Sequence, residues 1–296
     1  MKPTHLKAIL AILVIVISFY SLPVQAAMSK GIYLTQETVE NTALLNYLIK
    51  RAKAVGINTF VADLEIPSKR YEHNIKLLKE AGIVYIARII VFPGGASREQ
   101  MESIPYREKK YRLVQKAIDY GALAIQLDYI RYNTQQRGSS QNAENVLKVI
   151  NWFKNRLAAQ DIPLQIDVFG IASFGESKYI GQNIKLFAKS VDVICPMVYP
   201  SHFEPYRYYA QRPYQIVYDS LNAIKDQFPN KNVPVKIIPY IELSNYRYPL
   251  SHSKKLDYIV AQIKATENGG ADGWYVWSPH NLYDNLFQVL SNYHAK

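Results

Sequence analysis

Eight short apolar runs, separated by longer amphipathic stretches, are the feature that most constrains the fold of this chain. The runs have the length of strands and span residues 31–34, 59–63, 84–91, 124–128, 164–169, 193–198, 236–241 and 273–277. The stretches between them have helical periodicity and include residues 40–54, 73–80, 109–120, 143–159, 214–227 and 256–266. Because strands that alternate with helices form parallel βαβ units, eight units in about 270 residues favour a closed α/β fold, the (β/α)₈ TIM barrel.

The N-terminus has the pattern of a secretory signal. A short basic start precedes an apolar run over residues 8–20, Pro23 ends the run, and small residues up to Ala26 offer a cleavage site. We expect residues 1–26 to be a signal peptide and 27–296 to be a single domain, exported to the periplasm or secreted. The alternative is an uncleaved membrane anchor, because the run is just short of the roughly 20 apolar residues that span a bilayer. After cleavage no stable membrane insertion is expected.

Composition and charge exclude several functional classes. The single cysteine, Cys195, allows neither a disulfide framework nor a Cys-rich metal site. The net charge of +11 could favour anionic partners, but the Lys and Arg residues are scattered and no nucleic-acid-binding or phosphate-cradling motif is present. We therefore expect no nucleic-acid partner. His202 and His280 have no metal ligands at suitable spacing, so we expect no metal and no other cofactor. A GxSxG serine-hydrolase motif is also missing from the sequence.

Strand alternation predicts which side chains point into the barrel. In residues 164–169 the apolar Leu164, Ile166 and Val168 belong against the helices, which leaves Gln165 and Asp167 facing inward. The same alternation predicts inward positions near the strand ends for Asp63, Arg88, Gln126, Asp128, Tyr199, Glu242 and Trp277. A filled barrel core would prefer Val, Ile and Leu at such positions, so these polar and aromatic groups indicate a site at the C-terminal mouth.

The charged residues also have structural interpretations. Asp63 or Glu65 could cap a helix or pair with Arg88, and Asp128 could pair with Arg131. Asp167 could likewise be a buried hydrogen-bonding residue.

The aromatic residues point to carbohydrate. Trp277, at the end of the last run, could be core packing or a platform for a sugar ring, and His202 and His280 could be ordinary surface residues. The loop after the sixth run interleaves arginines with aromatic rings, on which the C–H faces of sugars stack: Phe203, Tyr206, Arg207, Tyr208, Tyr209, Arg212 and Tyr214. The arginines would also suit an acidic polysaccharide or a peptidoglycan-type glycan.

Five ordered motifs carry a family resemblance. They are Lys30-Gly-Ile-Tyr-Leu-Thr35, Ile125-Gln-Leu-Asp128-Tyr-Ile-Arg131-Tyr132, Asp167-Val-Phe-Gly170, Cys195-Pro-Met-Val-Tyr199-Pro-Ser-His202 and Gly273-Trp-Tyr-Val-Trp277-Ser-Pro-His-Asn281. Together they resemble a family of glycoside-hydrolase-like barrels that was long catalogued as a domain of unknown function, distantly similar to chitinase-like and alpha-amylase-like barrels. The resemblance spans residues 30–283 and implies a carbohydrate-active (β/α)₈ barrel. The chain departs from the family at Tyr132-Asn133, where Phe-Pro is usual, and at Glu242, where glutamine is expected.

Paired carboxyls fit glycosidic hydrolysis, which needs one acid to protonate the leaving oxygen and one carboxylate to attack or to activate water. Asp128 and Asp167 end neighbouring strands, about 4.8 Å apart by sheet spacing, which suits a retaining mechanism (roughly 5 Å) better than an inverting one (about 6.5–9.5 Å). We predict Asp128 as nucleophile or stabiliser, with Arg131 holding its environment, and Asp167 or Glu242 as general acid/base. The residues predicted to contact substrate are Asp63, Arg88, Arg131, Tyr199, His202 and Trp277.

These features predict an exported glycoside hydrolase that cleaves a polysaccharide. The first alternative is a non-catalytic carbohydrate-binding barrel, because the fourth strand carries a lone Asp128 where chitinase-like motifs have several acidic residues. A polysaccharide deacetylase would need a metal triad of one Asp and two His, and the histidine spacing argues against it.

Overall fold

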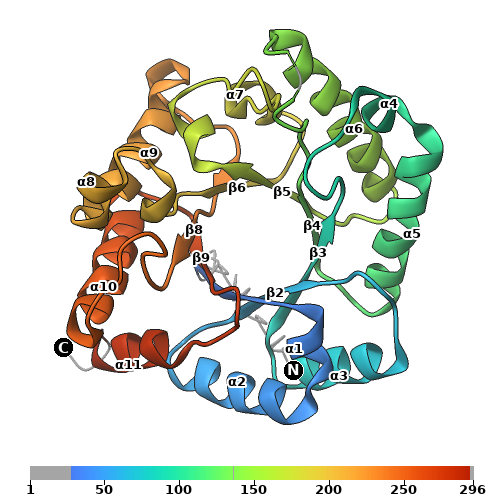
Figure 1. Cartoon of the computed structure of the whole chain (residues 1–296). Helices are drawn as coiled ribbons and strands as arrows, with labels where there is room; N and C mark the ends of the chain where they lie inside the picture. Colours follow the sequence, from blue (N-terminus) through green and yellow to red (C-terminus); the bar gives the residue numbers. More distant parts are fainter. Residues whose placement is uncertain (1–27, 136, 294–296) are drawn as a thin grey trace, which may run out of the picture.

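A computed structural model describes residues 28–135 and 137–293. The strands are all parallel and close into a barrel in the order β5-β4-β3-β2-β1-β9-β8-β6-β7, with β5 pairing β6 (Figure 1). Their bounds are β1 Ser29–Leu34, β2 Thr59–Asp63, β3 Val84–Ile90, β4 Ala124–Asp128, β5 Leu164–Phe169, β6 Val193–Met197, β7 Lys236–Ile237, β8 Tyr240–Glu242 and β9 Gly273–Trp277. The predicted (β/α)₈ barrel is confirmed. The predicted signal peptide, residues 1–26, lies outside the described residues.

One barrel position is shared by two short strands. The run predicted as a single strand over residues 236–241 is divided into β7 and β8, and both pair with β6. Pro239 lies between them, and a proline has no backbone N–H to donate to a neighbouring strand. The ladder is therefore interrupted at this point, although the chain keeps its place between β6 and β9.

Helices surround the barrel (Figure 1). They are α1 Gln36–Glu40, α2 Thr42–Ala54, α3 Lys69–Glu80, α4 Arg98–Glu102, α5 Ile104–Asp119, α6 Ser140–Ala158, α7 Ile184–Phe187, α8 Tyr206–Ala210, α9 Pro213–Asp226, α10 His252–Asn268 and α11 Asp284–Tyr293, with 3-10 helices η1 Gly170–Phe174, η2 Pro200–His202 and η3 Pro229–Lys231. The α3 helix begins four residues before its predicted start because the Ser68 side chain accepts from the Tyr71 N–H. Neither Asp63 nor Glu65 caps that helix. None of the helices in the described residues is long and apolar enough to cross a membrane.

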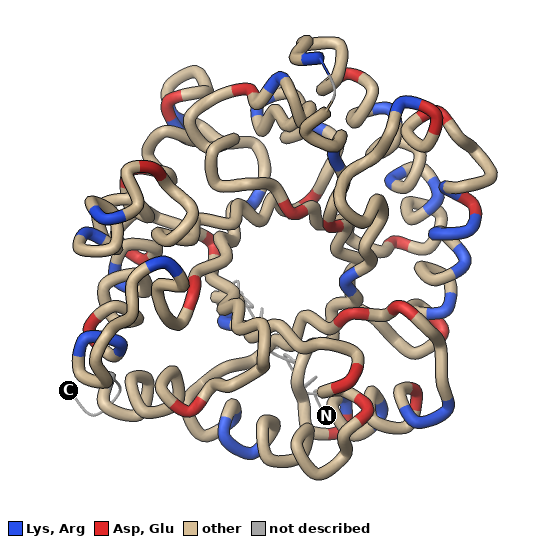
Figure 2. Tube along the Cα trace, viewed as in Figure 1, with Lys and Arg blue, Asp and Glu red and all other residues tan. Residues whose placement is uncertain are grey.

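Apolar side chains fill two layers. Leu164, Ile166 and Val168 belong to the large cluster between barrel and helices, as alternation predicts. A smaller cluster fills the barrel itself and consists of Tyr33, Val61, Ile86, Ala124, Val193, Cys195, Tyr199, Ile238, Tyr240 and Tyr275. Most Lys, Arg, Asp and Glu residues lie on the outer helices and loops, and only a few lie on the barrel strands (Figure 2). Those few charged residues include the candidate site.

Candidate active site

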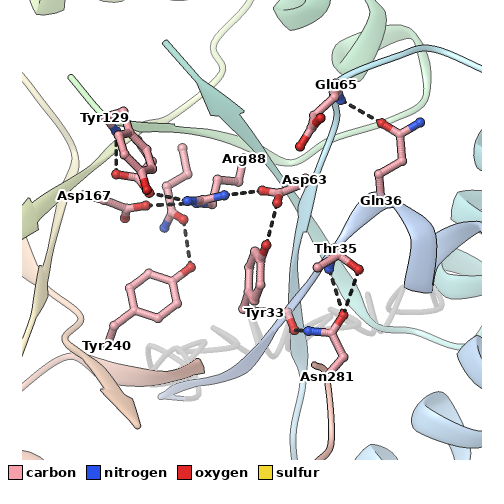
Figure 3. Close-up of polar contacts among 12 residues, drawn as sticks. Tyr33, Thr35, Gln36, Asp63, Glu65, Arg88, Tyr129, Asp167, Tyr240 and Asn281 are labelled. Carbon is pink, nitrogen blue, oxygen red and sulfur yellow. Dashed lines mark hydrogen bonds and ion pairs between the residues drawn. The ribbon is translucent and has the colours of Figure 1, made fainter. Parts of the chain in front are cut away.

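One arginine gathers three carboxyl groups at the C-terminal ends of β2, β4 and β5. In β3, Arg88 directs Nη1 to Asp63 and Nη2 to Asp128, and its Nε lies 3.4 Å from Asp167 (Figure 3). The strands place these groups together because Arg88 is in register with Asp63 on one side and with Gln126, two residues before Asp128, on the other. All four side chains are largely buried. We call Asp63, Arg88, Asp128 and Asp167 the acid cluster.

Two further groups orient the acid cluster. The Tyr33 hydroxyl donates to Asp63 Oδ2 at 2.6 Å, and the Arg88 guanidinium lies 5.2 Å from the centre of the Tyr33 ring. The backbone N–H of Tyr129 donates to Asp128 Oδ1. Tyr129 itself has a φ of 53°, a left-handed conformation that residues other than glycine rarely adopt. Asp63 and Asp128 therefore each have a second donor besides Arg88.

Asp167 has the most enclosed carboxyl group of the acid cluster. Its side chain is only 2% exposed, and its Oδ1 has no hydrogen-bond partner among the described residues. Burial and the neighbouring Asp128 charge raise the pKa of Asp167 well above its ordinary value, although Arg88 opposes the rise. Burial also raises the pKa of Asp63, against the effect of Arg88. The acid cluster thus favours retaining a proton on a carboxyl group.

A polar layer lies inside the barrel below the acid cluster. The Tyr240 hydroxyl donates to Gln126 Oε1 at 2.8 Å, and Gln126 Nε2 donates to Gln165 Oε1 at 3.2 Å. Gln126 also contacts the Cys195 sulfur at 3.4 Å, and the Tyr275 hydroxyl lies 3.4 Å from Gln165. This network satisfies polar groups that would otherwise be costly to bury. It closes the barrel beneath Asp128 and Asp167.

Aromatic rings occupy the other side of the mouth. The Tyr199 ring, which follows β6, stacks on Trp277 at the end of β9, with centroids 5.1 Å apart and planes 21° apart. His202 packs against Tyr199 at 5.3 Å, and Tyr246 packs against Trp277 at 5.4 Å. Trp277 is partly exposed and Tyr246 is 48% exposed. We call Tyr199, His202, Tyr246 and Trp277 the aromatic wall.

Glu242 lies behind the aromatic wall, where its carboxylate binds residues outside the acid cluster. Its fully buried carboxylate accepts from the Ser201 N–H at 2.8 Å, the Ser201 hydroxyl at 2.7 Å and the Tyr258 hydroxyl at 2.7 Å. Burial raises the pKa of Glu242 to about 7, and these three hydrogen bonds oppose the rise. Since Ser201 is in η2 and Tyr258 in α10, Glu242 ties the segment that carries the aromatic wall to the outer helices.

In residues 28–135 and 137–293, no three His, Cys, Asp or Glu side chains are arranged to hold a metal ion.

A cavity of about 1020 Å³ opens at the end of the barrel opposite the acid cluster, where it is lined by residues from the starts of the strands, among them Thr59, Val84, Val193 and Lys236. The acid cluster is not part of its lining.

Comparison with known families identifies the fold's relatives. The sequence profile of a family described as "Putative glycosyl hydrolase domain" matches residues 106–283, more than half of the chain. The chain belongs to this family. The family resemblance expected from the five motifs is thereby confirmed. No curated protein matches the sequence.

Solved structures similar to this family member include a spore cortex-lytic enzyme, a mannanase and a chitinase. The spore cortex-lytic enzyme SleL of Bacillus cereus matches with a TM-score of 0.64 and 13% identity, over 89% of this chain and 74% of SleL. An endo-beta-1,4-mannanase of Thermotoga petrophila matches with a TM-score of 0.66 and 12% identity, over 90% and 76%. A chitinase of Chromobacterium violaceum matches with a TM-score of 0.61 and 12% identity, over 90% and 99%. At these identities the similarity establishes the fold.

The structure corrects one predicted contact in this family member and confirms another. Pairing of Asp128 with Arg131 was wrong. Arg131 Nη1 donates to the Tyr132 carbonyl at 2.9 Å, and its guanidinium lies over the Phe169 ring at 4.8 Å. Arg131 is in the loop after β4, where it follows no strand alternation, whereas Arg88 points inward from β3. The pairing of Asp63 with Arg88 is confirmed.

Several residues of the mouth were not predicted from sequence. Tyr33 occupies an inward position of β1, and the strand alternation that indicated Asp63 could have predicted it from the sequence. Tyr246 lies in the loop between β8 and α10, and the Tyr129 contact depends on a backbone turn. Neither has a periodic signal. His280, for which an ordinary surface position was one interpretation, is exposed.

Proposed function

We propose that this protein is an exported glycoside hydrolase that cleaves glycosidic bonds in a polysaccharide at the C-terminal mouth of its barrel. The observation that carries the proposal is the meeting of Asp128 and Asp167 on Arg88. Barrel enzymes place their chemistry at this end of the strands. Glycosidic hydrolysis needs an acid and a carboxylate side by side. Export rests on the signal-like pattern of residues 1–26.

Charge balance assigns the proton. Three ionised carboxylates around one guanidinium would leave two uncompensated negative charges in a largely buried site, which is costly. The acid cluster therefore keeps a proton, and burial next to Asp128 favours Asp167 as its holder. Asp167 is accordingly the general acid, in preference to Glu242, whose carboxylate is already engaged by Ser201 and Tyr258.

Asp128 acts as the nucleophile. Its side chain is 6% exposed, against 2% for that of Asp167. In the first step an Asp128 oxygen bonds to the anomeric carbon, the glycosidic C–O bond breaks, and the leaving oxygen takes the Asp167 proton. Water then attacks the same carbon, gives its proton to Asp167 and releases Asp128. Neighbouring strands about 4.8 Å apart suit this retaining course.

A non-catalytic carbohydrate-binding barrel is the second candidate. The observation in its favour is that Arg88 engages all three carboxyl groups and that the Asp167 side chain is only 2% exposed. In such a protein the aromatic wall would hold the glycan. The acid cluster would then serve only to close the barrel.

Turnover of a polysaccharide panel separates the two candidates. The wild type should release reducing ends from at least one polysaccharide. Asp128→Asn should abolish the release while its melting temperature stays close to that of the wild type, and Asp119→Asn, at an exposed position of α5, should retain full activity. Binding without release by the wild type would favour the carbohydrate-binding barrel. A folded Asp128→Asn variant with full activity would refute the catalytic assignment.

A further inference from the structure

An exposed arginine borders the aromatic wall. Arg247, in the loop between β8 and α10, lies with its guanidinium 4.1 Å from the centre of the Tyr206 ring. The preceding residue, Tyr246, packs against Trp277. Burial lowers the pKa of His202, and the Arg247 charge lowers it further. Arg247 is therefore next to the surface on which a sugar ring would stack.

Positive charge predominates on this side of the mouth. Arg207, Arg212 and Arg247 are all exposed, and none forms an ion pair with a carboxylate of the described residues. Arg212 lies over the Tyr208 ring at 4.0 Å. Glu204 is an acidic residue in this region, and it accepts from the Tyr206 hydroxyl at 2.7 Å. A guanidinium stacked on an aromatic ring keeps its N–H donors at the edge, where they can bind a carboxylate with two parallel hydrogen bonds.

The two sides of the mouth differ in the charge that they accept. Asp63, Asp128 and Asp167 outnumber Arg88 near β2 to β5, so an anionic group would be repelled there. The Arg247 side, which follows β6 and β8, attracts such a group. A negatively charged sugar unit can then stack on the aromatic wall while the bond to be broken lies over the acid cluster.

We infer that the glycan is an acidic one whose sugar units carry carboxylates, and that Arg247 is the residue that selects it. The inference rests on the proposed glycosidase for cleavage, but the binding it describes can be measured separately. A charge-assisted contact with Arg247 should improve affinity about tenfold over the uncharged glycan. Because the contact is exposed, the gain should shrink at high salt.

Matched pairs of glycans test the inference. The probes are polygalacturonate, alginate, hyaluronan and peptidoglycan glycan strands freed of their peptides, each beside its carboxyl-reduced form, in which the same backbone has lost its charge. The first three carry the carboxylate of a uronic acid and the last carries that of a lactyl ether, so the panel also distinguishes these sources. Binding is measured by affinity electrophoresis in the Asp128→Asn background, so that no probe is consumed.

At least one acidic probe should bind about tenfold more tightly than its reduced form. Arg247→Gln should bring its affinity down to that of the reduced form, whereas Arg112→Gln, at an exposed position of α5, should change neither. Equal binding of both forms, no binding of any acidic probe, or an equal loss for both forms in Arg247→Gln would overturn the inference. Reducing-end release by the wild type is scored apart. Release from neutral glycans alone would support the glycosidase and contradict the acidic substrate. Binding of an acidic glycan without release would contradict the glycosidase and support the acidic ligand.

Discussion

The two sides of the barrel mouth are held together by different forces. Near β2 to β5 the side chains are charged, and Arg88 joins each carboxyl of the acid cluster by an ion pair. Near β6, β8 and β9 aromatic rings pack on one another, and the charged group Glu242 lies behind them. Ion pairs fix reacting atoms in one geometry, whereas stacking accepts sugar rings of varied identity. The contrast suggests that the reaction is set on one side and the substrate is chosen on the other.

Removing the cation should have the largest effect. Arg88→Gln leaves three buried carboxyl groups without their partner, so the free energy of unfolding should fall by about 3–5 kcal/mol. Urea denaturation at pH 7 measures the loss. At pH 5 the loss should be smaller, because protonation relieves the repulsion between the carboxyl groups. Unchanged stability, matching that of an Arg112→Gln control, would show that charge does not hold this side together.

Loss of the general acid comes next. Asp167→Asn should lower kcat on a polysaccharide by about 10²–10⁴-fold, and by less on an aryl glycoside, whose leaving group needs no proton. The raised pKa of Asp167 keeps it protonated, so wild-type activity should fall as the pH rises through that pKa. The variant should lack this alkaline fall. An equal fall in kcat on the polysaccharide and on the aryl glycoside would contradict the role of Asp167 as general acid.

On the aromatic side, Glu242 should produce a pH-dependent stability. Its pKa is raised from 4.5 to about 7 in the folded protein, so its contribution is fully present below about pH 4.5 and is lost as the pH rises through about 7. The full loss corresponds to about 3 kcal/mol. The difference in unfolding free energy between wild type and Glu242→Gln, measured by urea denaturation from pH 4 to 8, should change by this amount. A flat difference would mean that Glu242 has an ordinary pKa.

The smallest effect is expected for Trp277, the partly exposed ring proposed to stack on a sugar. Trp277→Ala should raise KM about fivefold with little change in kcat, because ring stacking contributes about 1 kcal/mol. Trp152→Ala, which removes an equally large ring from α6, should leave KM unchanged. Steady-state kinetics on the preferred polysaccharide measure both. A fall in kcat alone would place Trp277 with the reacting groups and would remove the division between the two sides.

Local patterns were sufficient to predict most of the fold. Four strands, β2, β4, β5 and β9, have the predicted bounds, since a strand between two polar turns is recognisable from its own residues. The early start of α3 depends on the Ser68 cap, and the division of β7 from β8 depends on Pro239. Both signals are present in the sequence but concern single residues, which periodicity does not reveal.

For the candidate site, the sequence predicted which side chains point into the barrel but not which of them form ion pairs. Alternation indicated that Asp63, Arg88, Asp128 and Asp167 point inward, because that depends only on position within a strand. It did not indicate that one guanidinium reaches three carboxyl groups, because this depends on strand order and on the lengths of side chains in space. Arg131 is close to Asp128 in sequence, yet the turn after β4 directs it toward Phe169.

The turn at Tyr129 has a consequence for the resting protein. A left-handed φ of 53° disfavours any residue with a side chain, by about 1 kcal/mol. The folded chain tolerates this conformation at the residue whose backbone N–H donates to Asp128. Its hydrogen bond holds the Asp128 carboxylate in place in the resting protein, and under the proposed function this orientation precedes the binding of a sugar. Under the proposed function, the barrel gives up this part of its stability at the strand end that carries the proposed nucleophile.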